Sequence, residues 1–115
     1  MKYAIPITEN KNWDSPVGEH FGRVPLYAIW DQETNTLDII PNESNHFGGV
    51  GMPAEFLATK SNAIICSGIG ARAIDLCNQL GLDLYIGATD TIRVTIDLLT
   101  SGKLTKASRK DGCDH

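Results

Sequence analysis

A cysteine stands directly before a glycine-rich turn at residues 63–72, which read AIICSGIGAR. The short apolar run predicts a buried strand that ends at Cys66, and Gly68 and Gly70 predict a turn into a helix. The first N–H groups of a helix have no partner within the helix, so they bind anions well. Together with Arg72, the thiol and these amides predict a site for a phosphate, a carboxylate or an anionic metal–sulfur cluster.

Cys66 itself has two interpretations. Amides at a helix N-terminus lower the pKa of a nearby thiol and favour the thiolate that metals bind, which makes Cys66 a candidate metal ligand. Alternatively, a lone cysteine that follows two isoleucines fills core space and is inert. Cys77 falls on an apolar helical stripe, so we predict that it is a core residue.

A second candidate ligand is His20, within the sequence EHFGR at residues 19–23. Histidine binds metals or donates a hydrogen bond to an anion, and the nearby Gly22 lets the backbone approach a ligand closely. Arg23 adds a cation that balances the negative charge of such a ligand. The alternative is a solvent-exposed histidine with no role in binding.

The last residues, Gly112 to His115, contain a further thiol and imidazole. Cys113 and His115 form a ligand set suited to copper, zinc or iron. We expect one domain over residues 1–104 and a mobile tail over residues 105–115, which are rich in polar residues and glycine. Eleven extended residues reach roughly 35 Å, enough to bring the tail to a ligand site, although such tails are often passengers.

The apolar pattern predicts five strands and three helices in the order βββαβαβα, an α/β fold with a mixed sheet. A polar turn at residues 33–35 makes the second and third strands antiparallel, whereas each strand–helix–strand unit returns in parallel. If the first two strands are also antiparallel, strands one, three, four and five end at one edge, where α/β sheets favour ligands. We expect strands at residues 2–7, 26–30, 37–40, 63–66 and 82–86. We expect a first helix over residues 55–60 and a second helix whose apolar stripe contains Ala73, Leu76, Cys77 and Leu80. The third helix is expected to begin at a cap formed by Asp90, to place Ile92, Ile96 and Leu99 on one face, and to end at Gly102.

Size and composition exclude several classes of function. A chain of 115 residues forms one domain, and its net charge of -4 argues against nucleic-acid and anionic-membrane partners. Three cysteines without paired spacing fit a reducing compartment, so we expect a cytoplasmic protein. The glycine turn lacks the third glycine of a dinucleotide-binding fingerprint, and the chain has no Walker-type GK[ST] sequence, so neither NAD binding nor nucleotide hydrolysis is predicted.

Several motifs, taken in order, resemble the dinitrogenase iron–molybdenum cofactor biosynthesis family, which includes NifX, NafY and the carboxyl-terminal domain of NifB. The resemblance implies a ribonuclease H-like three-layer α/β/α fold whose five-stranded mixed sheet has the order 3-2-1-4-5, with strand 2 antiparallel. It also implies a carrier of anionic metal–sulfur clusters, with His20 as the favoured cluster contact and Cys66 as the cysteine of the family's C-x-x-I-G pattern. The motifs are EHFGR at 19–23, NHFGGVGMPAEFL at 45–57, AIICSGIGARAIDLCNQLGLDLYIGA at 63–88 and GKL at 102–104.

We therefore expect a non-enzymatic carrier or assembly scaffold for an iron–sulfur or iron–molybdenum type cluster. His20 and Cys66 are its candidate ligands, the amides from Gly68 to Ala71 and two arginines balance the charge, and the partners are cluster donor or acceptor proteins. Nucleases built on a ribonuclease H-like scaffold need converging carboxylates, which the inward strand positions lack, so we do not expect an enzyme. The alternative is a small-anion metabolite-binding or protein-interaction module in which the glycine loops bind.

Overall fold

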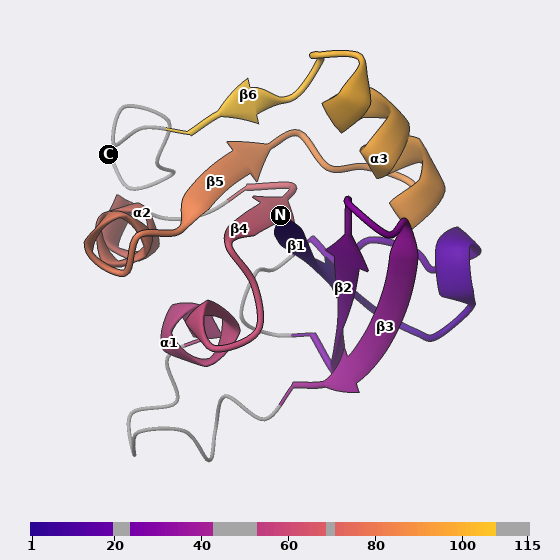
Figure 1. Cartoon of the computed structure of the whole chain (residues 1–115), viewed down its shortest axis with the longest axis horizontal. Coiled ribbons are helices and arrows are strands. Elements are labelled where there is room, and N and C mark those ends of the chain that lie inside the picture. The colour runs from indigo at the N-terminus through magenta and orange to yellow at the C-terminus, as the bar shows by residue number, and fades with distance from the viewer. Residues whose placement is uncertain (20–23, 43–52, 69–70, 108–115) are drawn as a thin grey trace.

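The computed structural model describes residues 1–19, 24–42, 53–68 and 71–107, with the side chains of residues 53–55 and 71–72 left out of that description. Within these ranges the chain forms one sheet with helices on both faces (Figure 1). None of these helices is long and apolar enough to cross a membrane. The elements are β1 (Lys2–Ile7), the 3-10 helix η1 (Asn12–Asp14), β2 (Leu26–Asp31), β3 (Thr36–Pro41), α1 (Pro53–Ala58), β4 (Ala63–Cys66), α2 (Ala71–Gln79), β5 (Asp83–Ile86), α3 (Ile92–Thr100) and β6 (Thr105–Lys106).

The sheet has the strand order β3-β2-β1-β4-β5-β6. β2 pairs antiparallel with both β1 and β3, whereas β4 is parallel to both β1 and β5. This confirms the predicted mixed α/β sheet, its order through the fifth strand and the antiparallel direction of the second strand. The strand β4 is apolar at every position because the sheet is covered on both faces.

The expectation of five strands is wrong, because β6 extends the sheet beside β5 as an antiparallel edge strand. The N–H of Ala107 donates to the carbonyl of Leu84 at 2.8 Å, and Leu104 packs against the core below α3. β6 consists of two exposed residues, so it carries none of the apolar alternation by which strands are recognised. It begins inside the range 105–115 expected to form a tail, of which residues 108–115 lie outside the described residues.

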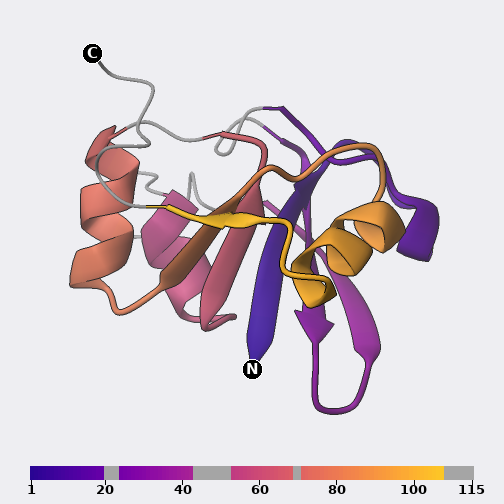
Figure 2. The ribbon, with the colours of Figure 1, turned by 90° about the horizontal axis from the view of Figure 1, so that it is seen from above.

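Two hydrophobic clusters fill the space on either side of the sheet. α1 and α2 cover one face and α3 covers the other, as the two views in Figures 1 and 2 show. Side chains along β4 alternate between these layers, since Ile64 and Cys66 lie in the α1/α2 cluster, whereas Ala63 and Ile65 lie in the α3 cluster. Cys66 therefore faces the layer formed by α1 and α2.

Helix α3 begins at a threonine cap, one residue after the cap that the sequence suggested. The hydroxyl of Thr91 accepts a hydrogen bond from the N–H of Val94 at 3.3 Å. Asp90, the expected cap, has a φ of +61° in the left-handed region and precedes the capping position. Gly102, with a φ of +74°, donates its N–H to the carbonyl of Leu99, which confirms the predicted end of this helix.

The apolar stripe of α2 differs from the predicted one at its end. Ile74 and Cys77 are completely buried, and Ala73 and Leu76 pack against the same cluster. Leu80 is 39% exposed and follows the last helical residue, so it does not belong to the stripe. Burial raises the pKa of the Cys77 thiol to about 11, and its place in the core confirms the prediction for this residue.

Candidate functional site

The carboxyl ends of four strands lie at one edge of the sheet, which we call the carboxyl edge. β1, β4 and β5 are parallel, and β3 has the same direction because two antiparallel pairs separate it from β1. The chain leaves this edge after Ile7, Pro41, Cys66 and Ile86. This arrangement confirms the predicted common edge, which is where open α/β sheets usually bind ligands.

Cys66 is the last residue of β4, and its side chain is buried with 1% exposure. It shares a cluster with Tyr27 and Phe56, and its thiol donates a hydrogen bond to the carbonyl oxygen of Tyr85 at 3.9 Å. Burial, and after it the charge that Cys66 carries as a thiolate, raise the pKa of the neighbouring Tyr27. The sulfur thus faces the core, and a ligand reaches it only when the covering groups move.

Hydrogen bonds tie the turn after β4 to the turn after β5. The carbonyl of Cys66 accepts from the N–H groups of Gly87 at 3.0 Å and Ala88 at 3.1 Å. The Ser67 hydroxyl donates to the carbonyl of Ala88 at 2.7 Å. Gly87 has a φ of +110°, a conformation that side chains disfavour, so the glycine permits this close connection. Gly68 follows as a partly buried residue, and the two turns form one connected surface at the carboxyl edge.

Helix α2 begins at Ala71, directly beyond this turn. Its first turn contains no acidic residue, so no carboxylate of its own competes there with a bound anion. Arg72 lies in that first turn, but its side chain and the whole of Gly70 are outside the described residues. The start of α2 therefore has the local features of an anion-binding helix N-terminus.

Residues 16–18 lie beside the end of β1 at the same edge. The N–H of Val17 donates to the carbonyl of Asp90, and that of Gly18 donates to the carbonyl of Pro6, both at 2.9 Å. β4 pairs only with the first half of β1. Residues 16–18 lie beside the second half of β1, where Val17 bridges to Ile7. The sequence analysis missed it because isolated bridges have no periodicity.

The residues on either side of His20 and Arg23 are in contact. A Cβ added to Gly18 would lie 2.3 Å from Cγ1 of Val24. Val24 is 6% exposed, and its carbonyl accepts a hydrogen bond from Nδ2 of Asn42 at 2.8 Å. His20 and Arg23 themselves lie outside the described residues. The described residues Gly18 and Val24 therefore lie side by side at the carboxyl edge.

Metal ligands do not cluster within the described part of the chain. There, no three His, Cys, Asp or Glu side chains come close enough to hold a metal ion. Cys66 and Cys77 form no disulfide bond, and both are buried. Cys113 and His115 lie outside the described residues. A metal site at the carboxyl edge therefore requires donors from outside the described ranges, or sulfide supplied by the bound cluster.

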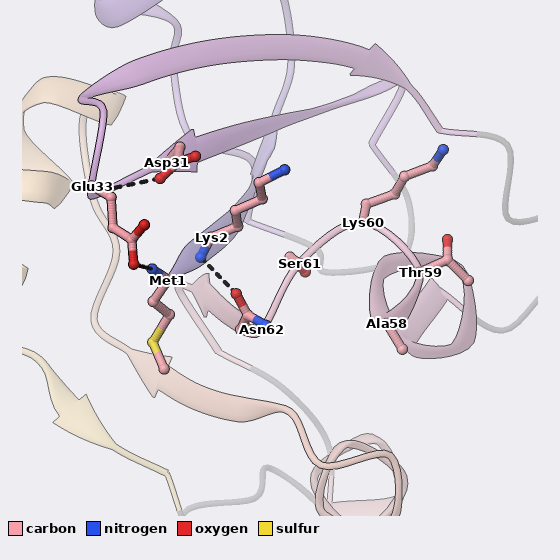
Figure 3. Close-up of a pocket in the computed structure, with 9 residues that line it drawn as sticks. All are labelled: Met1, Lys2, Asp31, Glu33, Ala58, Thr59, Lys60, Ser61 and Asn62. Atoms are coloured by element: carbon pink, nitrogen blue, oxygen red, sulfur yellow. Dashed lines mark hydrogen bonds and ion pairs between the residues drawn. The ribbon is translucent and has the colours of Figure 1, made fainter.

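A hollow of about 440 Å³ lies at the opposite edge, where β1 and β4 begin (Figure 3). One pair of charges at its rim is matched, since the Met1 ammonium is 3.6 Å from Oε1 of Glu33, and Oδ1 of Asn62 accepts a hydrogen bond from the backbone N–H of Lys2. Among the residues that the structure describes, its lining contains no cysteine or histidine, the donors that a metal–sulfur cluster favours. The lining residues are Met1, Lys2, Asp31, Glu33, Ala58, Thr59, Lys60, Ser61 and Asn62.

Fold and site together define a small α/β domain in which a cysteine-terminated strand meets a helix N-terminus at the carboxyl edge of a mixed sheet. A family model described as dinitrogenase iron-molybdenum cofactor matches residues 1–102. The chain belongs to this family, as the motifs indicated.

Individual relatives agree with this assignment. The chain is 36% identical over 112 residues to an uncharacterized protein of Methanocaldococcus jannaschii, with 92% of this chain and 91% of the relative covered. It is similar to the NMR structure of a Thermotoga protein described as a NifB protein, with a TM-score of 0.75, 25% identity and 91% of each chain covered. The apo orange protein of Desulfovibrio gigas has the same fold, with a TM-score of 0.79 at 19% identity and coverage of 93% and 92%.

Proposed function

We propose that this protein binds and carries an anionic metal–sulfur cluster, as a non-enzymatic carrier or assembly scaffold. The observation that carries the proposal is the family match over residues 1–102, since this family is defined by iron–molybdenum cofactor handling. The cluster is cargo that the protein receives from a donor protein and gives to an acceptor protein. An iron–sulfur or an iron–molybdenum type of cluster fits the proposed donors.

The proposed binding site is the carboxyl edge around the start of α2. The amides of Gly68 to Ala71 neutralise the negative charge of the cluster, because a helix N-terminus carries a partial positive charge. Arg23 and Arg72 supply full charges, and Gly70 keeps the turn free of a side chain. This assignment is supported by the hydrogen bonds that hold the turn after β4 against the turn after β5.

We propose His20 as the first cluster ligand and Cys66 as a second ligand that binds later. His20 has support because the described flanks of its segment, Gly18 and Val24, touch each other at the carboxyl edge. Cys66 is 1% exposed, so its sulfur becomes available only after the cover above the α1/α2 core opens. Cys113 and His115 are proposed as accessory ligands, since a soft thiol and an imidazole suit the same metals.

The broader assignment follows the same family. We propose that the fold is a ribonuclease H-like three-layer arrangement with an additional edge strand, because the strand order and the helix layers match that pattern. We place the domain at residues 1–104. We place the protein in the cytoplasm, because buried thiols that form no disulfide suit a reducing compartment. No catalytic step is assigned to it.

The second candidate is a small-anion metabolite-binding or protein-interaction module. The burial of Cys66 favours it, because a thiol that only fills the core leaves anion binding to backbone amides. Under this alternative, removing the imidazole or the thiol leaves ligand binding unchanged.

The test is anaerobic cluster loading of the native protein and three variants, His20→Ala, Cys66→Ala and Cys77→Ala. After incubation with a synthetic iron–sulfur or molybdenum–sulfur cluster, each protein is desalted, and bound metal, sulfide and visible absorption are measured. We expect stoichiometric retention by native protein and Cys77→Ala, a severalfold loss in His20→Ala and a smaller loss in Cys66→Ala.

Cys77→Ala is the matched control, because Cys77 is equally buried but lies in the core on α2. Equal losses in both cysteine variants would mean that core damage, not ligation, lowers retention. Failure of the native protein to retain either cluster contradicts the carrier assignment and favours the anion-binding module.

A further inference from the structure

A groove of about 460 Å³ lies on the face of the sheet that α3 covers. It is lined by residues of η1, of α3 and of the turn between β2 and β3. Of these elements, η1 and α3 are in contact and lie side by side in Figures 1 and 2. Its lining consists of Trp13, Asn35, Arg93, Ile96 and Asp97, and we call it the η1–α3 groove. It shares no residue with the proposed cluster site.

The floor of the groove is apolar and firmly held. Trp13 and Ile96 pack against the core cluster below α3, and each keeps part of its surface exposed. Asn35 has a left-handed φ of +53°, and its Oδ1 accepts a hydrogen bond from Nε1 of buried Trp30 at 3.0 Å. The groove wall near the hairpin is therefore anchored to the core rather than free to collapse.

Polar groups on the groove remain available for a partner. Among the described residues, the indole N–H of Trp13 and the amide NH₂ of Asn35 donate no hydrogen bond. A partly exposed tryptophan with unused donors beside it is typical of the anchor positions of protein–protein interfaces. A small ligand would leave part of this apolar and polar surface uncovered, whereas a polypeptide segment offers both side chains and backbone carbonyls.

The charges on the η1–α3 groove determine which kind of partner side chain it favours. Nε of Arg93 lies 3.2 Å from Oδ1 of Asp14, so these two charges offset each other. Asp97 is exposed and forms no ion pair within the described part of the chain, which leaves one uncompensated negative charge on the groove. A carboxylate and an indole that line the same groove both favour a cation, since the ring attracts positive charge as well.

We propose that the η1–α3 groove docks an arginine or lysine side chain from an extended segment of a partner protein. The cation approaches Asp97 along the indole of Trp13, and neighbouring apolar side chains of the partner cover Ile96. The chain's net charge of -4 attracts such a basic segment at a distance. This surface gives the protein a second interaction site, separate from the carboxyl edge.

The probe is the peptide acetyl-Leu-Arg-Leu-amide, titrated into the full chain and followed by the indole N–H signal of Trp13 in NMR spectra. A Trp13→Phe variant assigns that signal. The matched peptide contains citrulline, the neutral isostere of arginine. We expect the arginine peptide to move the Trp13 signal saturably and to bind about threefold more tightly than the citrulline peptide.

Three variants test the role of charge: two of them remove charges of opposite sign from the groove, and the third is a control outside it. Asp97→Asn is expected to weaken binding of the arginine peptide about threefold, whereas Arg93→Gln, which removes the competing cation, is expected to strengthen it by a similar factor. Asp38→Asn is the matched control, because Asp38 is an exposed carboxylate on β3 outside the groove. Its affinity for the peptide should equal that of the native protein.

Several results would overturn the proposal. Equal binding of the arginine and citrulline peptides shows that charge does not select the occupant, and weaker binding by Arg93→Gln shows that the groove prefers an anion. Equal losses in Asp97→Asn and Asp38→Asn show only a general charge effect. If ethylguanidinium alone binds as tightly as the peptide, the groove is a small-cation site rather than a docking surface.

Discussion

The contact between Gly18 and Val24 provides a direct test of how the candidate site is held together. A Cβ at Gly18 would lie 2.3 Å from Cγ1 of Val24, far inside van der Waals contact, and both residues are buried. We expect Gly18→Ala to lower the free energy of unfolding by about 2 kcal/mol, the usual scale for overpacking. Val24→Ala alone removes two buried methyl groups and costs about 2 kcal/mol as well.

The double variant separates this mechanism from general damage. When Val24 is alanine, the atom that blocks Gly18→Ala is gone and the new methyl group fills part of the cavity. We therefore expect the double variant to lose only about 2 kcal/mol, well below the sum of about 4 kcal/mol. The free energy of unfolding of all four proteins is measured by urea denaturation, followed by circular dichroism. The values can be compared when the unfolding free energy has the same dependence on urea concentration in each protein.

Gly81→Ala is the control, since a Cβ there meets no atom within 4 Å and so has no contact with Val24. Its cost should add to that of Val24→Ala within experimental error. If Gly18→Ala and Val24→Ala are also additive, the two flanks of His20 are not in contact as described. The structural support for placing His20 at the carboxyl edge would then be lost.

Two further predictions concern a buried thiol and a helix end. Burial raises the pKa of the Cys77 thiol from 9.0 to about 11, so the folded state holds this proton more tightly than the unfolded chain. The stability that this proton contributes is complete below pH 9 and is lost as the pH rises to 11. For the native protein, Cys77 should therefore lower the free energy of unfolding by about 2 kcal/mol between these two pH values, and in Cys77→Ala this part of the decrease should be absent. Gly102 ends α3 with a φ of +74° and open space around it, so Gly102→Ala should cost about 1 kcal/mol in thermal unfolding. Gly102→Asn should cost less, because asparagine tolerates this conformation, and equal costs would contradict a purely conformational cause.

The central strands were predictable because burial on both faces leaves a strong signal. β1 and β4 have the bounds that the apolar runs indicated, and both lie in the middle of the sheet. β6 was missed because an exposed two-residue edge strand is held by backbone hydrogen bonds, which any sequence can form. The sequence analysis placed the cap of α3 at Asp90, one residue before the observed cap at Thr91. Both residue types are good caps, and only the backbone conformation distinguishes them.

The site was predictable in position but not in detail. The sequence correctly predicts that Cys66 ends a strand at the edge where four strands terminate. Its burial depends on tertiary packing in a cluster that includes Tyr27 and Phe56 from distant elements. His20, Arg23, Gly70, Cys113 and His115 remain predictions, because they lie outside the described residues.

The burial of Cys66 determines the order of events in the proposed carrier. A sulfur with 1% exposure cannot make the first contact with a cluster. Under the proposed assignment, the backbone amides at the start of α2 and His20 therefore act before it. Uncovering the thiol disturbs the core around Tyr27, and this cost opposes tight binding. A carrier benefits from that opposition, because cargo held too tightly is not released to an acceptor. It follows that losing His20 should reduce cluster uptake more than losing Cys66, whereas Cys66→Ala should mainly speed cluster release.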